Sequence, residues 1–489
     1  MKPLLRTHAL EIRTADTQLV QPLSIELRPG QVLSIIGETG SGKSLFAQGI
    51  VGNLPAGLQA HGQVEFANGF SEAGTDSGRR ALWGREIAVL PQEPWLSLDP
   101  TMRARAQVAE TYECLAGSSK DGARQKAERD LQRLGLAHAA DKYPFQLSGG
   151  MAQRLAFAAT HAGGAKVMIA DEPTKGLDSA RIGEVIALLQ AGIANGGALL
   201  IITHDMEVAR RLGGDVMIML KGRIIETGTA EQIFSRPRHE YTRLLMDADP
   251  ARWQLPPRPA PAGEPVVKVR DLAVERGGRT LFEGQSFDVR PGEIVGVTGP
   301  SGCGKSTLGD VILELVAARQ GSVTRARGLP RVAFQKLFQD PVAAFAPTVT
   351  LARSLADLVS LHQLDASRIA PLLKRLRLEP SLLDRLPGNV SGGELQRFSL
   401  LRVLLLDPVL IFADEPSSRL DLITQKEMIE LLIEAASESQ TAVLLVSHDE
   451  ALIDAVSDQR IHLGAREQSA ITTEHADLHD CPPRMSQQA

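Results

Sequence analysis

The sequence predicts two consecutive α/β domains, each built on a mostly parallel β-sheet with helices on its faces. Two observations predict this architecture. The chain carries one large internal repeat, with the same short segments in the same order in both halves. Short apolar runs also alternate with glycine-rich loops and amphipathic helical segments in each half, as in sheets that helices cover on both faces. A length of 489 residues is enough for two such domains.

The repeat is visible in four pairs of segments. Each pair has one member in the first half and one in the second: GETGSGKS at 37–44 and GPSGCGKS at 299–306, LSGGMAQR at 147–154 and VSGGELQR at 390–397, VMIADEP at 167–173 and LIFADEP at 410–416, IITHD at 201–205 and LVSHD at 445–449. We therefore place the first domain at 1–246 and the second at 266–465. A proline-rich, exposed linker is expected at 247–265, and a polar, disordered tail at 466–489.

Composition restricts the class of protein. The chain is 43% hydrophobic and 23% charged, as in ordinary globular proteins, and its net charge of −5 argues against a broad nucleic-acid-binding surface. Three widely spaced cysteines predict neither a disulfide framework nor a zinc site, which favours the cytoplasm. The apolar runs are too short to cross a bilayer, so any membrane part is expected to come from other subunits.

The first segment of each half has the chemistry of a phosphate loop. It follows an apolar run that predicts a buried strand, at 31–37 and 293–299. Its glycines let backbone N–H groups converge on phosphate oxygens at the start of a helix. Lys43 and Lys305 are expected to reach the β- and γ-phosphates, and the hydroxyls of Ser44 and Ser306 to bind Mg²⁺.

Two acids end a buried strand in each half. We expect Asp171 and Asp414 to orient Mg²⁺, and Glu172 and Glu415 to activate the attacking water as general bases. The less favoured alternative is that Asp-Glu before proline merely marks a turn.

Histidine and glutamine complete the pattern. His204 and His448 follow the next buried strand, where they can contact the γ-phosphate, although a single histidine is more often structural. Gln92 and Gln339 can face both the metal and the water, or can merely cap a loop.

The SGG segments distinguish the chain best, because each is a second phosphate-binding helix start. Phosphate loop, glutamine, SGG signature, Asp-Glu, Leu-Asp (Leu177–Asp178 and Leu420–Asp421) and histidine occur in this order in both halves. This order resembles the ATP-binding-cassette (ABC) family over about nine-tenths of the chain. The resemblance implies ABC-type phosphate-loop ATPase domains, each with a helical signature subdomain, and ATP and Mg²⁺ as cofactors.

In that family two cassettes pair head to tail, so that each ATP lies between the phosphate loop of one and the signature of the other. The implied first site comprises Gly37, Glu38, Thr39, Gly40, Ser41, Gly42, Lys43, Ser44, Gln92, Asp171, Glu172 and His204, closed by Ser391, Gly392 and Gly393. The second comprises Gly299, Pro300, Ser301, Gly302, Cys303, Gly304, Lys305, Ser306, Thr307, Gln339, Asp414, Glu415 and His448, closed by Ser148, Gly149 and Gly150. The implied Mg²⁺ ligands are Ser44, Gln92, Asp171, Ser306, Gln339 and Asp414.

The segment IFSRPRHEYTRLLM at 233–246 resembles the tail of the peptide/nickel importer ATPases, and FQDP at 338–341 resembles their glutamine loop. This resemblance implies a peripheral protein on the cytoplasmic face of the inner membrane. Its expected partners are two transmembrane permease subunits and an extracytoplasmic substrate-binding protein, and oligopeptides, nickel, metal chelates or opines are the expected cargo. The alternatives are another importer class for sugars or vitamins, an accessory cassette of a phosphonate-degrading complex, and a soluble tandem cassette acting on ribosomes.

Three features of the sequence depart from the family pattern or allow two interpretations. The usual adenine-stacking aromatic is missing from residues 8–20, and Arg276 stands at the expected position in the second half. Trp95, Leu96 and Leu98 are either an interface anchor or core residues. His475, His479 and Cys481 suggest either a metal-binding tail or a solvated end.

Overall fold

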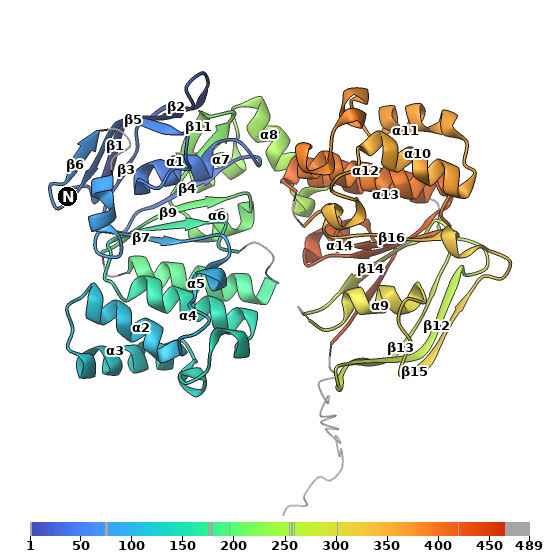
Figure 1. Ribbon diagram of the computed structural model, residues 1–489, viewed down its shortest axis with the longest axis horizontal. Helices are drawn as coiled ribbons and strands as arrows, with labels where there is room; N and C mark the ends of the chain where they lie inside the picture. Colours follow the sequence, from blue (N-terminus) through green and yellow to red (C-terminus); the bar gives the residue numbers. More distant parts are fainter. Residues whose placement is uncertain are drawn as a thin grey trace, which may run out of the picture.

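A computed structural model describes residues 2–464 apart from 74–76, 175, 176, 178, 195, 254, 256, 257, 259, 301 and 419. The repeated halves form two lobes that lie side by side (Figure 1). In the view of Figure 1 the lobes are inverted relative to each other. Helices α2–α4 lie at the bottom of the first lobe, and α10–α12 lie at the top of the second.

The first lobe holds two sheets. The central sheet has the order β11-β10-β4-β9-β8-β7 and is parallel except for β11. Its strands are β4 (Val32–Ile36), β7 (Ile87–Leu90), β8 (Val167–Asp171), β9 (Ala198–Thr203), β10 (Asp215–Leu220) and β11 (Arg223–Thr229). The smaller, antiparallel sheet contains β1 (Leu5–Arg13), β2 (Gln18–Leu23), β3 (Glu26–Leu27), β5 (Gln59–Phe66) and β6 (Ser71–Ala73).

The second lobe repeats this plan with fewer strands. Its central sheet is fully parallel in the order β16-β17-β18-β14-β19, and its smaller sheet is antiparallel. The central strands are β14 (Ile294–Thr298), β16 (Phe334–Leu337), β17 (Leu410–Asp414), β18 (Ala442–Val446) and β19 (Gln459–His462). The small sheet contains β12 (Val267–Arg276), β13 (Arg279–Val289) and β15 (Gln320–Arg325).

Helices flank the sheets in both lobes, and α7 and α8 of the first lobe have no counterpart among the described residues of the second. Those of the first lobe are α1 (Lys43–Val51), α2 (Ala104–Cys114), α3 (Lys120–Arg133), α4 (Gly149–His161), α5 (Ser179–Ile193), α6 (Met206–Leu212), α7 (Ala230–Ser235) and α8 (Glu240–Asp247). Those of the second are α9 (Lys305–Ile312), α10 (Leu351–His362), α11 (Ile369–Arg375), α12 (Gly392–Leu404), α13 (Leu422–Ser439) and α14 (Glu450–Val456).

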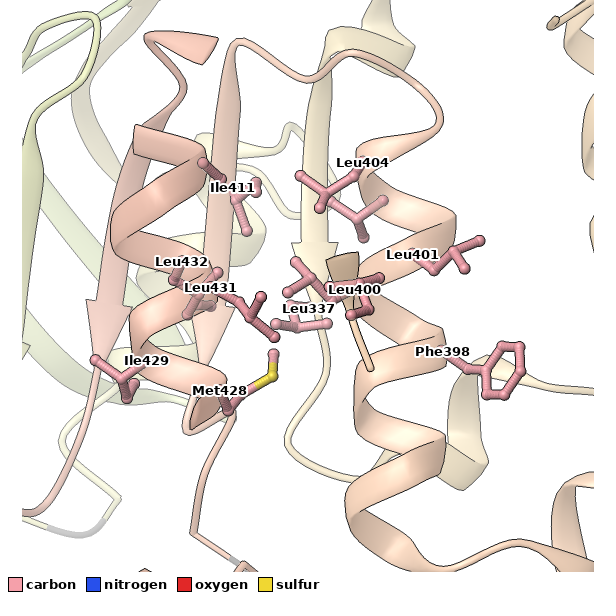
Figure 2. Close-up of a cluster of buried hydrophobic side chains, with 14 of the residues drawn as sticks. Leu337, Phe398, Leu400, Leu401, Leu404, Ile411, Met428, Ile429, Leu431 and Leu432 are labelled. Atoms are coloured by element: carbon pink, nitrogen blue, oxygen red, sulfur yellow. The ribbon is translucent and has the colours of Figure 1, made fainter. Parts of the chain in front are cut away.

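The central strands form where the sequence predicts them, because their residues are apolar on both faces, as a sheet covered on both sides requires. In the second lobe α12 and α13 pack on the sheet through a leucine-rich cluster that includes Leu337, Leu400 and Leu432 (Figure 2). Polar caps fix where helices begin. Asp421, for example, accepts hydrogen bonds from the Thr424 N–H and hydroxyl at the start of α13, a type of cap worth about 1 kcal/mol.

The connection between the lobes differs from the exposed linker that the sequence predicts. The 3-10 helix Pro250–Arg252 follows α8, and Pro250 is buried. Trp253 and Leu255 pack against the core of the second lobe, and the Arg258 guanidinium donates to the Val456 carbonyl and the Asp458 carboxylate. The connection is therefore held at both ends: Arg252 donates to the Phe234 carbonyl of the first lobe, and Trp253, Leu255 and Arg258 contact the second lobe. The Trp253 ring and the Arg258 guanidinium make the contacts with the second lobe, while Ala260, Gly263 and Glu264 are exposed.

Candidate functional site

Each glycine-rich loop connects a central strand to the helix that follows it. The loop 37–42 joins β4 to α1, and 299–304 joins β14 to α9. A Cβ atom on Gly37 would come within 2.1 Å of the Met219 carbonyl oxygen, and one on Gly299 would come as close to that of Leu463. Gly42 has φ 101° and therefore also needs to be glycine. The loops can thus curl tightly enough to direct N–H groups toward a phosphate.

The loop lysines lie inside these curled loops and are buried. The Lys43 Nζ donates to the carbonyl oxygens of Gly37 and Glu38, both at 2.8 Å. The Lys305 Nζ donates to those of Gly299 at 2.9 Å and Pro300 at 3.3 Å. Burial lowers the pKa of Lys43, although the charges of Glu172 and Asp171 oppose this effect.

A hydroxyl and a carboxylate meet at the start of each of these helices. The Ser44 Oγ donates to Asp171 Oδ1 at 3.1 Å, and the Ser306 Oγ donates to Asp414 Oδ1 at 2.9 Å. These are the hard oxygen ligands that Mg²⁺ prefers, and the same pair occurs in both lobes. The residues present therefore fit a magnesium ion at each loop.

A glutamate–histidine pair lies beside each serine–aspartate pair. His204 Nδ1 is 2.8 Å from Glu172 Oε2, and His448 Nε2 is 2.7 Å from Glu415 Oε1. Both glutamates have a left-handed backbone, with φ 49° and 47°, which is unfavourable for a residue other than glycine and is typical of functional positions. Burial would raise the pKa of Glu172, but the hydrogen bond from His204 and the charges of His204 and Lys43 together lower it.

The two glutamines have different surroundings. The Gln339 Nε2 donates to Glu415 Oε2 at 2.7 Å. Gln92 is exposed and lines, together with Asp171, a cavity of about 850 Å³. The structure thus brings Gln339 to the acid pair of its lobe, whereas it places Gln92 only on the same cavity as Asp171.

The SGG segments begin α4 and α12, as the sequence predicts. The hydroxyls of Ser148 and Ser391 accept the N–H groups of Met151 and Glu394 and cap the two helices. Both serines and the glycines that follow them, Gly149 and Gly392, are exposed. Their free faces suit a ligand that approaches from outside the lobe.

A glutamine in each signature helix was missed by sequence reasoning. The buried Gln153 donates to the Pro173 carbonyl at 2.8 Å, and the buried Gln396 donates to the Phe338 carbonyl at 3.2 Å. These bonds tie the helix to the residue after the acid pair in one lobe and to the residue before Gln339 in the other. The sequence indicated this glutamine only through its recurrence at the same place in LSGGMAQR and VSGGELQR.

The second lobe approaches the phosphate loop of the first. Burial raises the pKa of Glu38, and the nearby charge of Asp421 adds to this effect. The Tyr241 hydroxyl in α8 accepts the Glu38 N–H at 3.2 Å, and Leu422 packs in the same apolar cluster as Tyr241. The Leu-Asp segment of the second lobe thus lies at the first phosphate loop.

Both histidines line one cleft of about 420 Å³ between the lobes. Asp205 and Asp449, which follow them in sequence, line it too. Burial raises the pKa of Asp449, and the charge of Asp205 adds to this effect, so the two histidine-bearing strand ends lie close together.

The remaining residues that the sequence singled out are partly buried, partly exposed, or outside the described residues. Leu98 is buried in the core, Trp95 packs against the same core, and Leu96 is 72% exposed, so the Trp-Leu segment is part core and part surface. Ser301, Asp178 and the tail residues His475, His479 and Cys481 lie outside the described residues. Among residues that the structure describes, no helix is long and apolar enough to span a membrane, and no cluster of three or more His, Cys, Asp or Glu could hold a metal.

The family model described as "ABC transporter" matches residues 20–175 and 282–418, which include the phosphate loop, the SGG segment and the acid pair of each half. The chain belongs to the ABC transporter family. The predictions of two tandem ABC domains and of an ATP-binding ATPase are therefore confirmed.

Curated relatives extend over nearly the whole chain. The peptidoglycan transport ATP-binding protein YejF of Agrobacterium fabrum is 31% identical over 94% of this chain and 91% of its own length. The glutathione import ATP-binding protein GsiA of Escherichia coli K12 is 34% identical over 90% of this chain and 80% of its own. These relatives bear out the predicted similarity to the peptide/nickel importer ATPases.

Solved structures support the architecture of the whole chain. An archaeal ribosome recycling factor, aABCE1, crystallised with the ribosomal stalk protein aP1, aligns with a TM-score of 0.65 over 91% of this chain and 84% of its own. The identity is 20%, so the likeness concerns the fold. It confirms two ABC domains in one chain.

Proposed function

We propose that this chain is the ATP-hydrolysing subunit of an importer for peptides or peptide-related compounds, and that it hydrolyses ATP at two sites built from both lobes. The observation that carries the proposal is the occurrence of a complete set of site residues in each lobe, including both glutamate–histidine pairs. The relatives named for peptidoglycan transport and glutathione import support the cargo class.

In each site the phosphate loop binds the β- and γ-phosphates, and its lysine turns from the loop carbonyls onto them. Ser44 with Asp171, and Ser306 with Asp414, would hold Mg²⁺, with Gln92 and Gln339 beside them. When bound, Mg²⁺ neutralises charge on the phosphate oxygens.

Glu172 and Glu415 take a proton from the attacking water. His204 and His448 hold these carboxylates in place, and the hydrogen bond from His204 keeps Glu172 ionised. Because folding lowers the pKa of Glu172, its ionised carboxylate stabilises the folded state. This stabilisation is fully present above the pKa of an unfolded glutamate and is lost as the pH falls through the pKa of the folded state.

The signature of each lobe closes the site of the other. Gly150 and Gly393 complete the segments that begin with Ser148–Gly149 and Ser391–Gly392. The position of Asp421 beside the first phosphate loop supports this head-to-tail pairing. ATP binding then draws the lobes together, and hydrolysis releases them.

The motion is passed to two permease subunits through the surface next to each glutamine. Leu96 and Val342 follow the two glutamines and are 72% and 52% exposed, as an apolar docking surface requires. The chain would then lie peripherally on the cytoplasmic face of the inner membrane, and a substrate-binding protein would deliver cargo from the other side.

Affinity purification from gently solubilised membranes of the native cell tests this proposal. Two polytopic membrane proteins and an extracytoplasmic binding protein are expected to co-purify with the tagged chain. Uptake of the peptide class bound by that protein should stop in a Glu172→Gln, Glu415→Gln strain. Recovery of ribosomal proteins or soluble enzymes without a membrane protein would refute the importer.

A further inference from the structure

The second lobe has a cation beside its Mg²⁺-orienting carboxylate. Lys336 lies in β16 opposite Phe412 of β17, two residues before Asp414. Its Nζ is 2.7 Å from Asp310 Oδ1 and 3.5 Å from Asp414 Oδ2. The other oxygen of Asp414 accepts the Ser306 hydroxyl at 2.9 Å. The carboxylate is therefore shared between a proposed metal ligand and an ammonium group.

The ammonium group is held in this place. The Lys336 side chain is 13% exposed, and the rings of Phe338 and Phe412 flank it at 5.4 and 5.6 Å from their centroids. Cation–π contacts with two rings and an ion pair with Asp310 restrict its movement. Its charge consequently stays beside Asp414.

The first lobe has a different pair of residues at these positions. Val89 in β7 is the counterpart of Lys336. It lies opposite Ile169 of β8, two residues before Asp171, just as Lys336 lies opposite the residue two before Asp414. Gln48 follows Lys43 by the same number of residues as Asp310 follows Lys305. An ion pair in one lobe is thus replaced by a valine and an amide in the other.

We infer that Lys336 is a positioning residue that partly neutralises Asp414, so that the second ATP site binds the divalent cation more weakly than the first. This inference rests on the proposed role of Asp414 in holding Mg²⁺. A fixed positive charge this close to a metal-binding carboxylate competes with the metal for the same negative charge, and a difference of about tenfold in affinity is expected. In this account the two lobes carry the same reactive residues and differ in their requirement for Mg²⁺.

Mn²⁺ binding, measured by electron paramagnetic resonance with a non-hydrolysable ATP analogue, tests the inference without turnover. The wild-type chain should bind two Mn²⁺ ions whose affinities differ about tenfold. Lys336→Val with Asp310→Gln gives the second lobe the residues of the first and should bring both affinities to the tighter value. Val89→Lys with Gln48→Asp should bring both to the weaker value.

The reciprocal variants keep the test decisive if one of them fails to fold. Both pairs preserve net charge, so a general electrostatic change does not explain a shift. Asp414→Asn should remove the weaker ion. If Asp414→Asn and the corresponding Asp171→Asn leave Mn²⁺ binding intact, the proposed function of these aspartates is wrong. If both aspartates are required but the two affinities are equal and the exchanges leave them unchanged, only the inference about Lys336 is wrong.

Discussion

Replacing Glu172 and Glu415 by glutamine should stop ATP hydrolysis and preserve ATP binding. Glutamine has the same shape and can keep a contact with the histidine, but it cannot accept the proton of the attacking water. A general base contributes about 100- to 10,000-fold to a rate, or roughly 3–5 kcal/mol in the activation barrier. The double variant should therefore turn over ATP at least about 100-fold more slowly than the wild type.

The structure also sets the expectation for the single variants. The carboxylate–imidazole distances in the two lobes are 2.8 and 2.7 Å, so neither site is degenerate at this pair. At saturating Mg²⁺ and ATP, where the two sites contribute equally, each single variant should lose about half of the turnover, and more if the sites must act in alternation. Phosphate release would be measured with a coupled assay, and binding with a fluorescent ATP analogue. Turnover of the double variant within about threefold of the wild type would refute the assignment of the bases.

Three further substitutions probe contacts around the first site and the signature helix. His204→Ala removes the hydrogen bond that lowers the pKa of Glu172. The pKa of Glu172 should then rise, and the acid limb of the pH–rate profile should move to higher pH. An unchanged acid limb would contradict the role of His204 in keeping Glu172 ionised. Tyr241→Phe leaves the Glu38 N–H without its phenolic acceptor and should destabilise the first phosphate loop by about 1 kcal/mol. This loss should appear as faster hydrogen exchange at residues 30–50, and unchanged exchange would argue against the contact. Gln396→Ala removes the buried hydrogen bond from the side-chain amide to the Phe338 carbonyl. It should lower the free energy of unfolding of the second lobe by about 1–3 kcal/mol in urea titrations. Equal stability of the variant and the wild type would mean that this hydrogen bond contributes nothing.

Much of the fold could be predicted from the sequence because the strands at the centre of each lobe are apolar on both faces. Such runs end at residues that must be polar, and so the sequence locates the acid pairs and the histidines at strand ends. The phosphate loops are equally readable, since their glycines are required by backbone geometry that a side chain would block.

The contacts between distant segments could not be predicted in this way. The sequence of α8 gives no sign that the Tyr241 hydroxyl meets the Glu38 N–H, because that contact depends on how the tail folds back on the lobe. Lys336 reads as a charged residue in a short apolar run, and only the register of β16 against β17 places it beside Asp414. The docking of Trp253 was missed for the same reason: proline content describes the linker itself and not the surface that it meets.

The most direct test of the account is whether ATP brings the signature of one lobe onto the phosphate loop of the other. Cysteines would replace Thr39 and Ser391, both exposed, in a chain that carries Glu172→Gln to retain ATP and has Cys114, Cys303 and Cys481 changed to serine. The same chain with Thr39→Cys and Ser148→Cys, a pair within one lobe, is the control.

The account predicts a disulfide within a single chain that forms faster with ATP than with ADP, and none in the control. Equal rates with both nucleotides, or a disulfide only in the control, would contradict the head-to-tail pairing on which the two-site mechanism depends.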